Sequence, residues 1–367
     1  MRARAARVLG ALALAGAVGS APRTAQAQED HSASRTIGDT TFMLPAMADS
    51  AFVLSEFGFR QGINYEQIPD YPVASFARYN LQWIQFEEQA DFAVRITPWL
   101  GFYAQGIASG ALGPDTPSIL FEGGGLDFGG KGGIVLRLYR NERTKSQIAA
   151  RAYGGGDYGR TLDLPDFFGA FAIRAAKDVQ GIIQHTSNVS QLPGELQNEA
   201  FSLANSDYSN VVFYRSSAVR VGGSLHYAQA LVGPLTMQLS ANVEQAWETQ
   251  KPFSPTQQTY LSLDTNDTTV TFDAVLSASF MRWWVPLGLS AEYSGVTTAR
   301  SVSGAHATGA TTHYVGGGIW YTGRRGVEIG ALGFTQRSLS PVPGFATNET
   351  SGKPVGYMAS LVFRALW

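Results

Sequence analysis

A serine and a histidine two residues apart offer the clearest catalytic chemistry in the sequence. Ser224 and His226 occupy alternate positions of a stretch that reads as a strand, so both side chains share one face. A Ser beside a His can form a nucleophile with its general base. No acidic residue is evident that would orient the imidazole, and a structural role for the pair is therefore favoured.

Other reactive groups give weaker signals. Asp207, Asp264, Asp267 and Asp273 could supply the paired acids of an aspartyl protease, but they also fit solvated charges at strand ends. The glycine-rich residues 123–133, GGGLDFGGKGG, lead into a strand pattern, whereas a phosphate-binding loop needs the N-terminus of a helix. We expect no cofactor and no metal site.

Charged residues that alternate with apolar ones carry the strongest functional signal. If the apolar face of each strand points outward, the alternate positions line an interior. The inward basic residues are then Arg60, Arg95, Arg137, Arg151, Arg220 and Arg364, and the inward acidic residues are Glu244, Asp273, Glu292 and Glu328. Bases fall on the first six strands and the last, and acids on the others. This predicts two opposed walls lining a pore, with charge pairing in a packed lumen as the alternative.

Composition places these strands in an exported protein. Residues 1–27 combine Arg2, Arg4 and Arg7, an apolar core and an Ala-Gln-Ala cleavage site, which predicts a signal peptide. The chain has no cysteine, and after the signal no apolar run of about 18 residues that would form a membrane helix. Only 15% of residues are charged while 12% are aromatic. The net charge of −2 argues against a nucleic-acid partner.

Period-two alternation predicts about twelve strands, with ten or fourteen as alternatives. They cover residues 51–60, 77–97, 100–109, 131–140, 146–156, 218–230, 235–247, 268–281, 286–297, 311–322, 326–337 and 355–367. Turns of a few residues alternate with long loops, as expected for short periplasmic turns and long extracellular loops. Aromatic residues at or beside the short turns predict a membrane-interface girdle: Trp99, Trp283, Trp284, Trp320, Tyr321 and Trp367.

Two segments fall outside this pattern. Residues 157–215 form a long loop in which DLPDFFGAFAIRAAKDVQGIIQ has helical spacing. Its Phe167, Phe168 and Phe171 predict an amphipathic helix that narrows the lumen or caps its mouth. Residues 28–50 are polar with a short apolar patch, and they are expected to form either a periplasmic tail or a lumenal segment.

The last thirteen residues, VGYMASLVFRALW, alternate apolar and small or polar positions and stop on Trp367. This strand resembles the closing strand of bacterial outer-membrane β-barrels, in which a terminal aromatic residue is an insertion signal. The resemblance implies an all-β, transmembrane, antiparallel up-and-down barrel over residues 51–367 in a Gram-negative outer membrane. It also implies outer-membrane lipid and the barrel-assembly machinery as partners. In length and hairpin rhythm the chain weakly resembles the uncharacterised barrels found with aromatic-degradation pathways.

Within the barrel class the sequence favours a monomeric channel or transporter for small solutes. Outer-membrane phospholipase A and lipid A deacylases carry a His followed two residues later by a Ser on the lipid-facing side. Here the residue two positions after His306 is Thr308, and the residue two positions after His313 is Val315. Ser224 and His226 have the right spacing but stand in the reverse order. A structural or surface-interaction barrel with a plugged lumen is the main alternative, and a lipid hydrolase is the lesser one.

Overall fold

The computed structural model describes residues 35–74, 77–115, 118, 124–162, 213–254, 259–283, 285–302, 305–306, 309–324, 326–343 and 349–367. The predicted signal peptide, the helix predicted in residues 157–215 with Phe167, Phe168 and Phe171, and Trp284 lie outside this part. None of the described helical segments has the length and apolar character that crossing a membrane requires.

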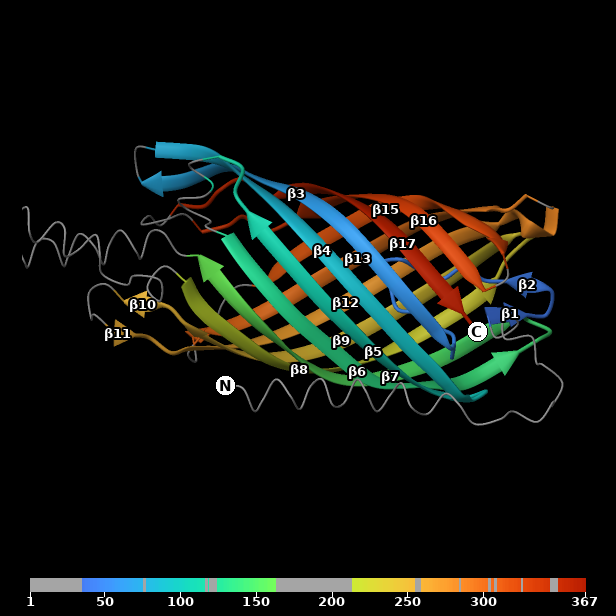
Figure 1. The fold of residues 1–367 in the computed structure, drawn as a ribbon. Helices are drawn as coiled ribbons and strands as arrows, with labels where there is room; N and C mark the ends of the chain where they lie inside the picture. Colours follow the sequence, from blue (N-terminus) through green and yellow to red (C-terminus); the bar gives the residue numbers. More distant parts are fainter. Residues whose placement is uncertain are drawn as a thin grey trace, which may run out of the picture. The chain divides into compact units, whose positions relative to one another are not determined.

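Twelve antiparallel strands form one closed barrel (Figure 1). Each strand pairs with its sequence neighbour, β12 pairs with β13, and the last strand β17 pairs with the first barrel strand β3, so the wall has no open edge. The predicted up-and-down topology and strand number are confirmed. The strands are β3 (Glu56–Ala74), β4 (Ala77–Thr97), β5 (Leu100–Leu112), β6 (Gly124–Asn141), β7 (Ser146–Leu162), β8 (Phe213–Ala230), β9 (Leu235–Lys251), β12 (Leu263–Ser279), β13 (Leu287–Val302), β15 (Ala310–Arg324), β16 (Val327–Ser338) and β17 (Val355–Leu366).

The connections differ between the two ends of the barrel. At one end, here called the turn end, strands are joined by short links such as Thr97 to Leu100, Arg324 to Val327 and, through a 3-10 helix at Phe280–Trp283, Ser279 to Leu287. Gly326 lies in one of these turns with φ +81°, and a Cβ there would meet the Leu366 carbonyl oxygen at 2.6 Å. At the other, loop end lie the longer connections and one short link, from Ala74 to Ala77, which differs from the long loop predicted there. This end also carries the short pairs β10 (Phe253–Ser254) with β11 (Thr259–Tyr260), and β14 (Ala305–His306) with β13.

Several strands are longer than the sequence predicted. Residues 61–74, interpreted as a loop because of their Pro and Gly, belong to β3 and pair with β4. Pro69 and Pro72 are tolerated because register shifts interrupt the ladder beside them, and Asp70 adopts φ +51°. Gly124–Gly130, also assigned to a loop, pair with β5 and β7. The strand content was underestimated because glycine and proline were treated as strand breakers. Pairing with the neighbouring strands keeps these residues in the sheet.

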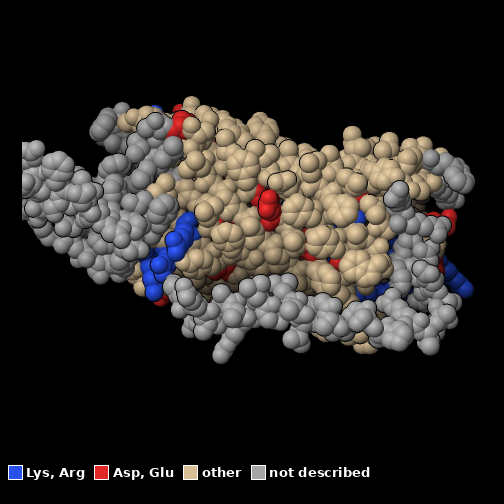
Figure 2. Space-filling model, viewed as in Figure 1, with Lys and Arg blue, Asp and Glu red and all other residues tan. Residues whose placement is uncertain are grey.

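The two faces of the wall have opposite character. Outward side chains are apolar and exposed, among them Phe272 at 50%, Leu289 at 48% and Leu361 at 64%. Inward neighbours such as Asp273 and Glu292 are buried. Figure 2 shows the same contrast as an outer face with few charged side chains. An apolar outside around a polar inside is the pattern of a barrel that spans a membrane.

The interface aromatics split into two groups. Trp99, Trp283, Tyr321 and Trp367 are exposed at the turn end, where an interfacial girdle would lie. The assignment of Trp320 is wrong, because its side chain faces the lumen and is completely buried. Its indole Nε1 donates a hydrogen bond to Ser290 Oγ at 3.0 Å, and the Arg364 guanidinium lies 5.2 Å from the ring centre. Trp320 is inward because it follows the outward Ile319 on β15.

Candidate functional site: the lumen and its N-terminal segment

Residues 35–55, here called the lumenal segment, enter the barrel and return to the start of β3. The predicted first strand over residues 51–60 is therefore wrong in its first half, and Ala51, Phe52, Val53 and Leu54 are buried inside the barrel. The segment contains only the small hairpin of β1 (Thr36–Ile37) and β2 (Thr40–Thr41). Its two limbs pack against each other through Phe42 and Phe52, whose ring centroids are 5.0 Å apart.

The segment is anchored at the turn end by charged groups. Arg140 donates to the Thr36 carbonyl at 2.7 Å, and Glu142 accepts the Gly38 N–H at 2.5 Å. Lys145 pairs with Asp39 across the same turn. Deeper in the lumen Arg35 pairs with Glu328, which is completely buried. These contacts fix the point at which the chain enters the barrel.

Side chains of the wall satisfy the irregular backbone of the segment. Arg364 donates to the carbonyl oxygens of Leu44, at 2.9 Å, and Pro45. The Glu292 carboxylate accepts the N–H groups of Ala46 at 3.1 Å and Met47 at 2.9 Å. Buried backbone groups require such partners, and charged partners make the stronger hydrogen bonds. The wall therefore holds this segment without taking it into the sheet.

Two further wall residues hold the backbone on either side. Gln238 donates to the Met43 carbonyl at 2.7 Å, and Arg60 donates to the Ala46 carbonyl at 2.9 Å. Packing supplements these bonds, since Met43 lies in the space left by Gly288, where a Cβ would collide with its sulfur. Met43 also belongs to a buried apolar cluster with Trp320.

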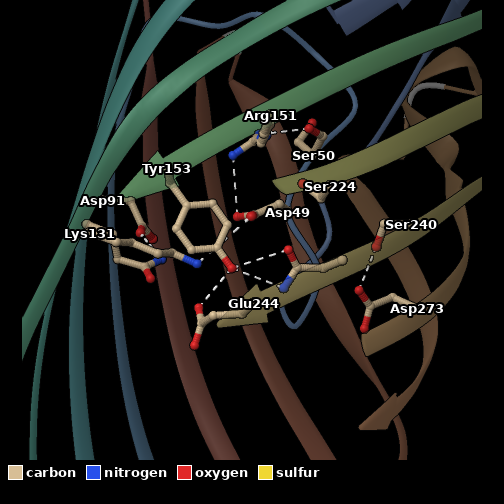
Figure 3. Close-up of polar contacts among 12 residues, drawn as sticks. Asp49, Ser50, Asp91, Lys131, Arg151, Tyr153, Ser224, Ser240, Glu244 and Asp273 are labelled. Atoms are coloured by element: carbon tan, nitrogen blue, oxygen red, sulfur yellow. Dashed lines mark hydrogen bonds and ion pairs between the residues drawn. The ribbon is translucent and has the colours of Figure 1, made fainter. Parts of the chain in front are cut away.

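The apex of the segment is set by Asp49 and Ser50 (Figure 3). Asp49 lies 3.4 Å from Arg151 and 4.0 Å from Lys131, and Arg151 also donates to the Ser50 carbonyl at 2.7 Å. Burial alone would raise the pKa of Asp49, but Arg151 and Lys131 outweigh it and lower the pKa from 3.8 to about 2. The apex is therefore an ion pair at neutral pH.

A polar cavity of about 410 Å³ adjoins this apex. Its wall includes Gln89, Asp91, Gln105, Asn242 and Asp273, together with the apex residues. Asp91 accepts hydrogen bonds from Gln89 at 2.9 Å and Gln105 at 2.7 Å, and Asp273 accepts one from Ser240 at 2.5 Å. The lumen thus contains an open polar space beside a filled one.

All ten side chains assigned to the lumen by parity stand at inward positions of their strands. Their roles in lining a pore stay a prediction. Five of them contact the lumenal segment directly: Arg60, Arg151, Arg364, Glu292 and Glu328. Arg220 bridges Asp157 and Glu244 instead, the latter at 3.2 Å.

The predicted separation into a basic and an acidic wall is wrong. Acidic residues also face inward on the early strands, including Glu66, Glu87, Asp127 and Asp157. They escaped the parity analysis because their stretches were interpreted as loops or as standing above the membrane. Glu87 pairs with Arg60 at 2.5 Å, so base and acid alternate around the wall.

Towards the loop end the inward charges become mainly acidic. In the described part of the wall nearer the loop end, three inward bases, Lys131, Arg220 and Arg300, stand among seven inward acids. Arg300 binds Asp267 at 2.6 Å and lies 4.0 Å from Glu248. The seven acids, here called the acidic vestibule, are Glu66, Glu87, Asp127, Asp157, Glu244, Glu248 and Asp267.

The candidate catalytic groups do not assemble. Ser224 Oγ lies 2.6 Å from His226 Nε2 in the lumen, but no carboxylate among the described residues hydrogen-bonds the other ring nitrogen. Asp264, Asp267 and Asp273 bind Thr249, Arg300 and Ser240 rather than one another, and Asp207 lies outside the described part. No group of three or more His, Asp or Glu in the described ranges could hold a metal ion.

Sequence reasoning missed how much of the lumen the N-terminal segment fills. The apolar run TTFMLPAM at residues 40–47 was the available signal, because large apolar side chains such as Phe42, Met43 and Leu44 are usually buried rather than exposed in a tail. Lys131 was missed because its stretch was assigned to the start of a strand rather than to the lumen. Both omissions concern contacts between residues far apart in the chain.

Solved structures that are similar to this chain include outer-membrane proteins. No protein-family model matches the chain, and no curated protein matches it. An outer-membrane channel of Pseudomonas putida F1 is similar with 11% identity and a TM-score of 0.49, over 89% of this chain and 100% of that one. The translocator domain of the autotransporter NalP from Neisseria meningitidis has 7% identity and a TM-score of 0.48, over 85% and 88%.

The Pseudomonas putida toluene transporter TodX has 10% identity and a TM-score of 0.36, over 86% of this chain and 90% of that one. These proteins are channels, transporters or translocator domains by their descriptions. The closed wall and the apolar outer face of this chain are by themselves the features of a β-barrel that spans a membrane.

Proposed function

We propose that this protein is an outer-membrane channel for small polar solutes, closed in the conformation described here by the lumenal segment. The observation that carries the proposal is the division of the lumen. A polar cavity of about 410 Å³ lies beside the apex of a segment that the wall holds through side-chain hydrogen bonds and ion pairs. A space of this kind suits a hydrated solute.

The lumenal segment is built so that it can leave without damage to the barrel. Its hairpin strands pair only with each other, and the barrel closes through β3 and β17 whether or not the segment is present. The chain has no cysteine that could tether it. Displacement breaks polar contacts that water can replace, but it also exposes buried apolar side chains such as Phe42 and Phe52, so the closed state is favoured and openings are brief.

The acidic vestibule defines the solutes that such a channel would favour. An excess of inward carboxylates at the loop end raises the local concentration of cations and lowers that of anions. We infer a preference for cations or cationic solutes, reduced at high ionic strength because salt screens exposed charges. Export through the signal peptide, a monomeric state and a narrowing role for residues 157–215 belong to the same proposal.

Single-channel recording in a planar bilayer tests the proposal. Three forms of the mature chain are compared: the full chain, a form with residues 36–50 replaced by a short Gly-Ser linker, and a form lacking residues 165–210. We expect rare openings in the full chain and steady, cation-selective conductance once residues 36–50 are replaced. A higher single-channel conductance in the form lacking residues 165–210 than in the full chain would support a narrowing role for those residues.

The alternative is a structural barrel whose lumen stays filled. It predicts no conductance in any of the three forms, although each folds, as shown by heat-dependent mobility on a denaturing gel. That result would overturn the channel proposal. The hydrolase alternative has less support, since the Ser224–His226 pair lacks an orienting acid in the described part of the chain.

A further inference from the structure

Three basic side chains stand side by side on the outside of the barrel. Arg160 of β7 is directly opposite Arg215 of β8, and Arg215 is directly opposite Lys251 of β9. All three are exposed and occupy outward positions of their strands. Directly opposed residues have Cβ atoms about 5 Å apart, so the three charges, here called the cationic row, fall within roughly 10 Å. Figure 2 shows Lys and Arg side chains gathered at the loop end of this face.

The cationic row forms no ion pair with an acid among the described residues. No ion pair or hydrogen bond joins any of its side chains to a described residue, in contrast to Arg220 and Arg300 inside the lumen. Like charges directly opposite each other destabilise a sheet. Three like charges in register therefore do not stabilise the isolated barrel. A bound anion would reduce the repulsion between them.

The height of the row identifies where that anion would lie. Arg160 is fourteen residues beyond the start of β7 at Ser146, which corresponds to roughly 35 Å for a tilted strand. The apolar band of such barrels is about 25 Å tall. On the turn side of the row, the outer face carries the exposed side chains of Tyr158, Val219 and Trp247. Tyr and Trp are typical of the membrane interface, and Val is apolar. The row thus stands just above the apolar band, at the level of lipid headgroups.

We propose that Arg160, Arg215 and Lys251 bind the phosphate groups of an anionic glycolipid in the outer leaflet. Two guanidinium groups present planar forks that match phosphate oxygens, and the adjacent ammonium supplies a third donor. The apolar side chains beneath them would contact the acyl chains of the same lipid. One ligand would thereby satisfy both the charges and the apolar surface, which a soluble anion cannot do. The proposal does not depend on whether the barrel conducts.

Native mass spectrometry of the purified full-length mature protein tests the proposal. Protein in mild detergent is titrated with lipid A carrying two phosphates and with the same lipid after dephosphorylation. We expect the phosphorylated lipid to bind at least about tenfold more tightly, because each basic residue near an anionic lipid adds severalfold. Replacing all three residues by Gln should reduce this preference below about twofold, and R215K alone should weaken it only slightly.

A matched control removes the same charge elsewhere. Arg78, Arg143 and Arg337 are exposed, and none is the cross-strand partner of another. Their combined replacement by Gln should leave lipid binding unchanged if the row is the site. Equal loss in both triple variants would reduce the effect to net charge and overturn the proposal. Full displacement of the lipid by millimolar pyrophosphate would also overturn it, since it would assign the row to a free anion. Heat-dependent gel mobility verifies that each variant is folded.

Discussion

Charged side chains have different surroundings in the two halves of the lumen. At the turn end, half-buried Arg364 and buried Glu292 bind backbone groups of the lumenal segment, and buried Glu328 pairs with Arg35. At the loop end, the seven acids of the acidic vestibule outnumber the three bases that pair with them among the described residues, Arg60, Arg220 and Arg300. Charge therefore holds the lumenal segment in one half and leaves an excess of inward acids in the other.

The difference shows that inward parity alone does not identify a pore-lining residue. Glu292 and Glu248 both point inward from their strands, but Glu292 accepts two backbone N–H groups and Glu248 lies beside Arg300 at 4.0 Å. A side chain such as Glu292 that hydrogen-bonds buried backbone has a structural role in holding the lumenal segment in place. A group with an incomplete set of partners next to open space is the better candidate for acting on a solute.

The largest effect should come from a charge placed on the outer face rather than in either half of the lumen. Leu289 is outward and exposed, and Leu289→Arg should destabilise the folded barrel by about 2–4 kcal/mol if it lies near the bilayer midplane. Urea unfolding in lipid vesicles measures this. Glu248→Gln, on the inner face of β9, is the comparison and should change the unfolding free energy much less, because Glu248 lies 4.0 Å from Arg300 and binds no backbone of the lumenal segment. Equal losses would contradict the assignment of the two faces.

The contacts that hold the lumenal segment should set how often the channel opens. Glu292→Gln and Arg364→Gln together remove the charges that bind residues 44–47, each hydrogen bond to a charged group being worth about 1.5–3 kcal/mol. We expect openings at least about tenfold more frequent in single-channel recordings. Glu248→Gln in the vestibule is the control and should leave opening frequency unaltered. Identical behaviour of both would show that the segment does not close the pore.

Acid should weaken the same closure. The folded pKa of Asp49 is about 2, below its ordinary value of 3.8, so the ion pair stabilises closure above pH 4 and is lost as pH falls towards 2. Allowing for partial solvent screening, the loss amounts to about 1–2 kcal/mol. Opening frequency should therefore rise several-fold between pH 5 and pH 3. Asp49→Asn should open more often at pH 5 and show a smaller pH response.

The smallest effect should fall on ion selectivity. Asp127→Asn combined with Glu248→Gln removes two vestibule charges that do not touch the lumenal segment. We expect the cation-over-anion permeability ratio to drop roughly twofold, measured as a shift of reversal potential in a salt gradient. The shift should vanish at 1 M salt. A selectivity change in the Glu292→Gln variant of the same size would erase the distinction between the two halves.

The sequence by itself determined the wall of this protein. Alternation along residues such as Val270, Phe272 and Ala274 places one face outward without reference to any distant residue, because the side-chain period of a strand is local. Short turns, long loops and the closing strand ending on Trp367 then predict antiparallel neighbours and a closed barrel. Hydrocarbon permits few other arrangements for such strands.

Only the tertiary structure decided what fills the lumen and which charges remain unpaired. Residues 35–55 have no period, and their place depends on Arg364, Glu292 and Gln238, which are more than 190 residues away in the sequence. Arg160 and Arg215 were hidden in what was interpreted as a loop, and they became neighbours only through the register of β7 and β8. Local pattern specifies which way a side chain points, whereas its partner is set by strand register and by the chain packed inside the barrel.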